Sequence, residues 1–132
     1  MIAIDTNILV RYAVKDDPKQ TSTATKFLRG NSCFVHKTVV LELVWVLSSA
    51  AGYALPRKTV VERLRHIFGL PTIETESPLQ LAQAINWYEQ GMDFADALHL
   101  ASSEGLTAFA TMDRKLATKA AKVAAASKVI AL

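Results

Sequence analysis

A chain of 132 residues, of which 51% are hydrophobic and 20% charged, has the composition of one globular domain and excludes a disordered or low-complexity protein. The net charge of +3 and the isoelectric point near 9.1 allow a polyanionic partner without requiring one. The mean hydropathy of +0.20 is slightly apolar for a soluble domain, which favours an additional buried surface such as a dimer or partner interface.

Three features of the chain indicate its compartment. Cys33 is the only cysteine, so no internal disulfide can form and a reducing environment is expected. The longest apolar run, residues 39–51, contains Glu42 and two serines and is too short to span a bilayer. No basic region precedes Asp5, so no signal peptide is expected. We therefore expect a soluble cytoplasmic protein without a membrane segment.

Short strand-like segments alternate with helix-like segments along the chain. Apolar β-prone runs predict strands at residues 2–4, 33–35, 72–74, 107–110 and 129–130. Capping residues, prolines and closing glycines predict helices at residues 6–14, 16–28, 38–51, 55–68, 77–90, 93–104 and 114–121. Strands that alternate with helices form parallel βαβ units. We therefore expect one domain, residues 1–132, with an α/β fold: a three-layer α/β/α sandwich around a central, mainly parallel sheet.

Acidic residues follow two of these strands. Asp5 comes directly after strand 2–4, and Asp113 comes shortly after strand 107–110. In open α/β sheets the working site lies beyond the carboxyl ends of the strands. If the two strands are neighbours, Asp5 and Asp113 face the same crevice.

Glu42 is surrounded by apolar residues in the sequence VVLELVWVL. A helix this apolar is expected to be buried on most of its circumference. An unpaired carboxylate there is costly unless a cation or strong donors compensate, and no lysine or arginine lies one turn away. The alternative is that Glu42 points outward at a helix end or meets a distant arginine.

Asp93 and Asp96 lie three residues apart, so both can occupy one helical face, where like charges repel. Asp93 has a structural explanation as a helix cap or first-turn acid. Asp96 lies deeper and is followed by an apolar face. Four or five carboxylates at one crevice would repel one another unless hard cations were bound, so the set predicts Mg²⁺ or Mn²⁺, as one ion or two, and attack of water on a phosphodiester.

Other chemistries fit the sequence less well. No glycine-rich phosphate loop follows the first strand, and no nucleophile elbow is present. Cys33 has no visible base partner. His99 lies three residues after Asp96 and could reach the site, but a packing or solvated role fits it better.

Four segments of the chain, IAIDTNILVR, VLELVWVL, DFADALHLA and FATMDRKL, together resemble the PIN-domain family, and within it the VapC-like toxins of bacterial toxin–antitoxin pairs. The resemblance covers essentially the whole chain and implies a metal-dependent endoribonuclease. It implies that the catalytic acids, which also hold Mg²⁺ or Mn²⁺, are Asp5, Glu42, Asp96 and Asp113, with Asp93 as an additional acid found in many members. The supporting polar residues that it implies are Thr6, Asn7 and Thr111.

The resemblance also implies an RNA substrate, a homodimer and a VapB-like antitoxin that inserts a side chain into the groove or blocks it. Basic residues that would contact RNA phosphates are Arg57, Lys58, Arg63, Arg65, Arg114 and Lys115. A solvated helix face is the ordinary explanation of such charges. Two alternatives stay open: a non-catalytic α/β protein-binding module whose acids hold a structural cation, and a nuclease that acts on DNA.

Overall fold

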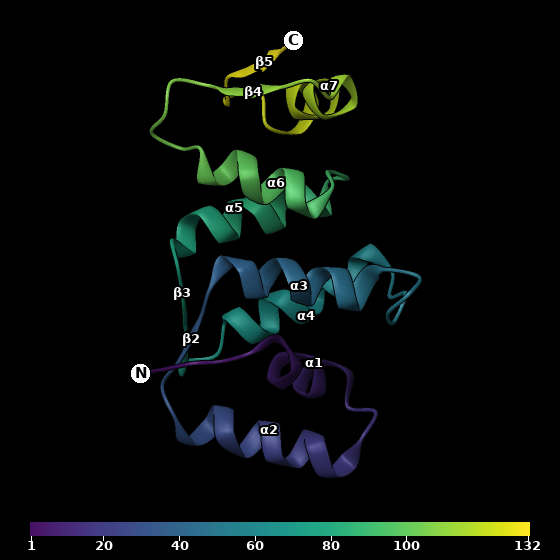
Figure 1. Ribbon diagram of the computed structural model, residues 1–132, viewed down its shortest axis with the longest axis vertical. Coiled ribbons are helices and arrows are strands. Elements are labelled where there is room, and N and C mark those ends of the chain that lie inside the picture. Colours follow the sequence, from purple (N-terminus) through teal and green to yellow (C-terminus); the bar gives the residue numbers. More distant parts are fainter. The chain divides into compact units, whose positions relative to one another are not determined.

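The computed structural model describes all 132 residues, which form seven helices and five short strands (Figure 1). The chain folds into two compact units, Met1–Glu76 and Ser77–Leu132, and each has a parallel sheet of its own. One or two helices separate successive strands, and every strand pair is parallel. The expected α/β fold class is therefore confirmed. That both units make a single domain stays a prediction.

The first unit has three strands and four helices. They are β1 (Ile2–Ala3), α1 (Thr6–Val14), α2 (Pro18–Gly30), β2 (Cys33–Val35), α3 (Lys37–Ser48), α4 (Arg57–Phe68) and β3 (Ile73–Thr75). The strand order is β1-β2-β3, with Cys33 of the central strand opposite Ile2 on one side and Ile73 on the other. Fully buried leucines from α1, α3 and α4, among them Leu9, Leu43 and Leu64, form the core. This packing fixes the start of α1 against α3.

The second unit contains α5 (Pro78–Glu89), α6 (Phe94–Ser102), β4 (Phe109–Thr111), α7 (Arg114–Val123) and β5 (Val129–Ala131). The helices α5 and α6 pack side by side (Figure 1). The rings of Tyr88 and Phe94 meet edge to face between them, at 5.6 Å between centroids. The strands β4 and β5 are parallel, and α7 packs beside them. No helix of the structure combines the length and the apolarity needed to cross a bilayer.

Most element bounds agree with the sequence-based expectation, and α1 and β2 agree to the residue. The third helix is shorter than expected, because it ends at Ser48 and not at residue 51. The chain then folds back, so that the Tyr53 N–H donates to the Val46 carbonyl at 3.0 Å. Gly52 lies so close to that carbonyl that a Cβ atom would collide with it. This close approach ends the helix and requires glycine.

The start of α3 also differs from the expected range 38–51, because the first helical residue is Lys37. The N-cap residue is His36, whose side chain makes no capping hydrogen bond. Glu76 instead accepts a hydrogen bond from the Lys37 N–H at 3.0 Å, and its carboxylate lies 3.2 Å from Nδ1 of His36. A residue forty positions away therefore satisfies this helix end.

Candidate functional site

The first acidic cluster forms where β1 passes into α1. Asp5 is the N-cap of α1, and its Oδ1 accepts a hydrogen bond from the Thr6 N–H at 2.6 Å. Thr6 is 5% exposed and is the only buried polar residue of the chain. Its hydroxyl donates to Oε2 of Glu42, on α3, at 3.3 Å. One buried threonine therefore positions two carboxylates that lie 37 residues apart in the sequence, because it binds Asp5 through its backbone and Glu42 through its side chain.

The expectation that Glu42 is enclosed by a buried helix is wrong. On α3 the buried residues are Val40, Leu43, Val44 and Leu47, which recur with the helical period and form one face. Glu42 is exposed on the other face, as is Trp45, which is 61% exposed. The carboxylate therefore needs no buried counter-charge. The apolar outward residue Trp45 made the helix resemble a fully buried one.

The second acidic cluster combines the N-termini of α6 and α7. Asp93 is the N-cap of α6 and accepts a hydrogen bond from the Asp96 N–H at 3.1 Å. Asp113 is the N-cap of α7, and its Oδ1 accepts from the N–H groups of Lys115 at 2.9 Å and Leu116 at 3.2 Å. Helix N-termini favour negative charge, because unpaired N–H groups and the helix dipole meet there.

Thr111 supports the second cluster from the end of β4. Its hydroxyl oxygen accepts a hydrogen bond from the Asp113 N–H at 3.0 Å. The strand was expected at residues 107–110 but runs from Phe109 to Thr111. Asp113 thus lies two residues beyond the strand, closer to its end than the sequence indicated.

Asp96 is half-buried and its side chain accepts no hydrogen bond within the protein. Burial raises the pKa of Asp96, and the neighbouring carboxylates of Asp93 and Asp113 raise it further. The nearby His99 acts in the opposite direction, although its own side chain is exposed. Asp93 and Asp113 therefore both lie within electrostatic range of Asp96.

The donors of these two clusters are suited to a hard divalent cation. All are carboxylate oxygens with hydroxyl groups beside them, and a cation would relieve the repulsion around Asp96. Neither unit by itself places three His, Cys, Asp or Glu side chains as a group that could hold an ion. The structure brings Asp5 together with Glu42, and Asp96 together with Asp93 and Asp113. That the two clusters face one crevice stays a prediction.

Asn7 does not join the first cluster by a hydrogen bond. It is exposed on α1 and lines a groove of about 490 Å³ with residues of α1 and α2, among them Arg11 and Phe27. The six basic candidates lie on two helices. Arg57, Lys58, Arg63 and Arg65 are exposed on α4, whereas Arg114 and Lys115 are exposed in the first turn of α7, directly after Asp113.

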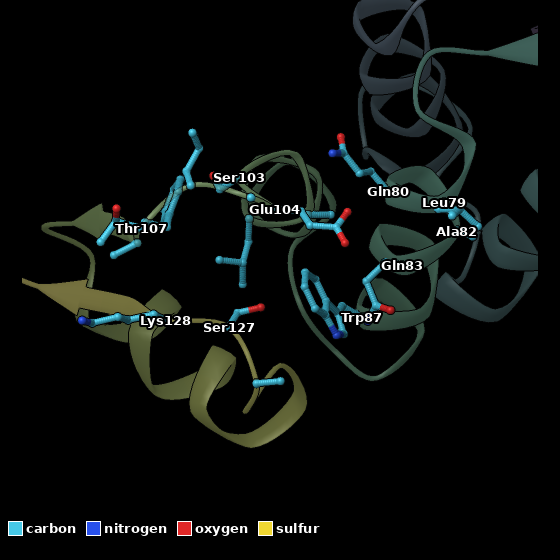
Figure 2. A pocket seen from close by; sticks show the side chains of 17 residues that line it. Leu79, Gln80, Ala82, Gln83, Trp87, Ser103, Glu104, Thr107, Ser127 and Lys128 are labelled. Atoms are coloured by element: carbon cyan, nitrogen blue, oxygen red, sulfur yellow. The ribbon is translucent and has the colours of Figure 1, made fainter.

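A cavity of about 700 Å³ in the second unit does not coincide with the acids (Figure 2). Its walls include Trp87 of α5, Glu104 after α6 and Lys128 before β5. It reaches Phe109, the first residue of β4, whereas Asp113 follows the last. Sequence reasoning gave no sign of this cavity, because no motif marks its lining residues. It contains none of the predicted site residues.

Comparison with known proteins identifies a family for the chain. No curated protein and no solved structure matches the sequence. The sequence model of the PIN domain matches residues 2–122, a range that contains all the predicted acids. PIN domains are nuclease domains that act on nucleic acid and generally use divalent metal ions. On this match over nearly its whole length, the chain belongs to the PIN domain family.

Proposed function

We propose that the protein is a divalent-metal-dependent endoribonuclease and the toxin of a toxin–antitoxin pair. The observation that carries the proposal is the cluster of Asp93, Asp96 and Asp113, in which burial and then the two neighbouring acids raise the pKa of Asp96 and Asp113 follows the carboxyl end of β4. Electrostatic repulsion between neighbouring carboxylates is unfavourable, and a divalent cation bound among them would offset it. Membership of the PIN domain family supports a nuclease in general.

The proposed site combines both clusters in a single domain. Asp5 follows β1 as Asp113 follows β4, and both cap the next helix. If the two strand ends are neighbours, Asp5 and Glu42 complete a ligand set with Asp96 and Asp113. Asp93 caps α6 and adds negative charge beside Asp96.

The protein's own groups hold this site in place. Thr6 directs the Glu42 carboxylate through its hydroxyl, while two backbone N–H groups fix one oxygen of Asp113. Asp96 has no donor inside the protein, so its oxygens are free to bind a ligand. Asp96 and Asp113, with Asp5 and Glu42, would hold the Mg²⁺ or Mn²⁺, which would supply Lewis-acid activation of water for hydrolysis of a phosphodiester.

The test is cleavage of total RNA and of single-stranded DNA by the purified protein with Mg²⁺ or Mn²⁺, against the same reactions in EDTA. We expect RNA cleavage that stops in EDTA and returns when excess metal is added. Equal cleavage with and without chelator would exclude the metal mechanism. Cation binding without cleavage of either substrate would instead support a protein-binding module, and cleavage of DNA alone would reassign the substrate.

We further propose a homodimer that also binds a small antitoxin protein. Large apolar side chains such as Trp45, Leu79, Leu106 and Met112 are exposed, and the mean hydropathy is positive. Obligate interfaces are typically large and apolar. Light scattering at micromolar concentration should give twice the chain mass of 14.4 kDa. A stable monomer that co-purifies with no partner would contradict this.

A further inference from the structure

One face of α7 carries four cations and no acid. Arg114, Lys115, Lys119 and Lys122, together with Thr118, line a shallow groove of about 290 Å³. The opposite face of the helix holds the buried residues Leu116 and Ala120. We call these five groove residues the α7 basic stripe.

The four cations of the stripe have no ion-pair partners. Arg114 and Lys115 also occupy the first turn of α7, which contains no acid. Cations at a helix N-terminus oppose the helix dipole and destabilise the helix. The position of these two residues is therefore unfavourable for folding and indicates another role.

The other basic helix, α4, differs in both respects. Glu62 lies among its cations, and Arg57 and Arg65 take part in interactions within the protein. Arg57 and Arg65 therefore have a structural explanation that the cations of α7 lack. Of the two helices, α7 is the stronger candidate for binding a polyanion.

The spacing of the stripe suits an extended strand of nucleic acid. Arg114, Thr118 and Lys122 form one row with a rise of about 6 Å between members, and Lys115 and Lys119 form a parallel row. The rows begin directly beside Asp113. At the other side, Nζ of Lys119 lies only 3.1 Å from where a Cβ on Gly91 would be, so it reaches the turn that precedes Asp93. The stripe thus adjoins the second acidic cluster at two points.

We propose that the α7 basic stripe binds the phosphate backbone of single-stranded RNA and leads it to the carboxylates at Asp113. This inference rests on the proposed ribonuclease function. Contacts from lysine, arginine and hydroxyl side chains to phosphates are independent of sequence and position the strand. An acidic protein would be a poorer occupant, because protein interfaces need apolar or aromatic anchors and this groove has none.

The test measures binding in EDTA, so that it does not depend on catalysis. The probe is a short fluorescein-labelled uridine oligonucleotide, titrated at several salt concentrations. Two double variants of the full chain remove two charges each: Arg114→Gln with Lys115→Gln, and Lys119→Gln with Lys122→Gln. The matched control is Lys26→Gln with Arg29→Gln, which removes two exposed cations from α2.

Each stripe variant should weaken binding about tenfold and lower the slope of log K against log salt by about 1.4, since each phosphate contact on a single strand contributes about 0.7. The control should change affinity less than about twofold. Thermal melts separate this from a folding defect. The Arg114/Lys115 variant should be at least as stable as wild type and the Lys119/Lys122 variant slightly less stable, because the dipole opposes the first pair and favours the second.

An equal loss of RNA affinity in the control and in the stripe variants would overturn the inference. So would a loss of affinity that follows the loss of melting temperature across the variants. A poly-glutamate competitor as effective as RNA at equal charge would also overturn it. The outcomes for the two proposals are distinguishable. Wild type that binds RNA through the stripe but never cleaves it would refute only the ribonuclease, whereas metal-dependent cleavage with binding unaffected by the stripe would refute only this inference.

Discussion

The two acidic clusters are built differently. In the first unit, Asp5 accepts a hydrogen bond from the Thr6 N–H and Glu42 accepts one from the Thr6 hydroxyl. In the second unit, Asp96 accepts none and lies in the fields of Asp93 and Asp113. The protein therefore supplies hydrogen-bond donors to both acids of the first pair, but none to the side chain of Asp96 in the second cluster. A bound cation should consequently affect the second cluster more strongly.

The largest expected effect is on cleavage, and it should be the same for both clusters. Asp5→Asn and Asp96→Asn each keep side-chain shape but remove a charge that would hold the metal. We expect each to lower RNA cleavage by at least about 100-fold, the upper end of the loss caused by removing an outer-shell partner.

The matched control is Asp17→Asn. Asp17 also caps a helix, α2, through its carboxylate, but it is not among the predicted acids. A gel-based cleavage assay should show near wild-type activity for this variant. If Asp5→Asn were equally active, Asp5 would be only a helix cap. The first cluster would then have no part in cleavage.

The next effect is on stability and should separate the clusters. Without metal, Asp96→Asn should melt at a higher temperature than wild type, because one of three repelling carboxylates is gone. Asp5→Asn should melt near wild type or slightly above it, because Asn caps helices nearly as well as Asp.

Added Mn²⁺ should stabilise the wild type by about 2.7 kcal/mol at 100 times its dissociation constant. Both variants should lose most of this gain. Scanning fluorimetry with and without Mn²⁺ measures both quantities. A metal-free Asp96→Asn that melts below wild type would show that the repulsion is not the controlling feature of the second cluster.

A smaller effect is expected at the residue that joins the first pair. Thr6→Val keeps the volume but removes the hydroxyl that donates to Glu42, so it should cost about 1 kcal/mol of unfolding free energy and about tenfold in cleavage rate. Thr6→Ser keeps the donor and should restore cleavage to within a factor of about two or three. Denaturant unfolding and initial rates measure the two losses. If Val and Ser behaved alike, the hydroxyl would have no role in positioning Glu42.

The smallest effect gives a baseline for a carboxylate outside both clusters. The pKa of Glu76 is lowered, first by the Lys37 N–H and then by His36, so the folded state favours its ionised form. The stability that it contributes is present above its ordinary pKa of 4.5 and disappears as the pH falls through the lower folded value.

Glu76→Gln should therefore lower the melting temperature by about 1–2 °C at neutral pH, since exposed charges contribute little, and by nothing in strong acid. Melts across the acid range test this. A deficit that persisted at the lowest pH would attribute the effect to shape and not to charge.

Local signals in the sequence were enough for most of the fold. Capping residues, prolines and apolar runs predicted the order of the elements and the bounds of α1, although the residue that caps α1 is Asp5. Asp93 proved to be an N-cap, as its structural explanation required, and it also lies in the field of Asp96. Long-range contacts could not be predicted, because no local pattern indicates that Glu76 caps α3 or that Gly52 lies against the Val46 carbonyl.

The face of α3 could have been predicted from the same residues. The spacing of Val40, Leu43, Val44 and Leu47 is helical, and it leaves Glu42 and Trp45 together on the outer side. The helix was expected to be buried on most of its circumference because Trp45, although it faces outward, is apolar. Local patterns likewise do not encode which acids from distant segments meet, such as Asp96 and Asp113.

The outward position of Trp45 has an optical consequence. The chain has two tryptophans, one in each unit: Trp45 is 61% exposed and Trp87 is 7% exposed. A solvated indole emits at longer wavelength than a buried one, so the two units contribute separable bands to a single emission spectrum. Trp45 lies one helical turn from Glu42, and paramagnetic Mn²⁺ quenches nearby indoles, whereas Mg²⁺ does not. The protein therefore carries an intrinsic fluorophore beside one of its acids. In a Trp87→Phe variant, Trp45 would be the only tryptophan that emits.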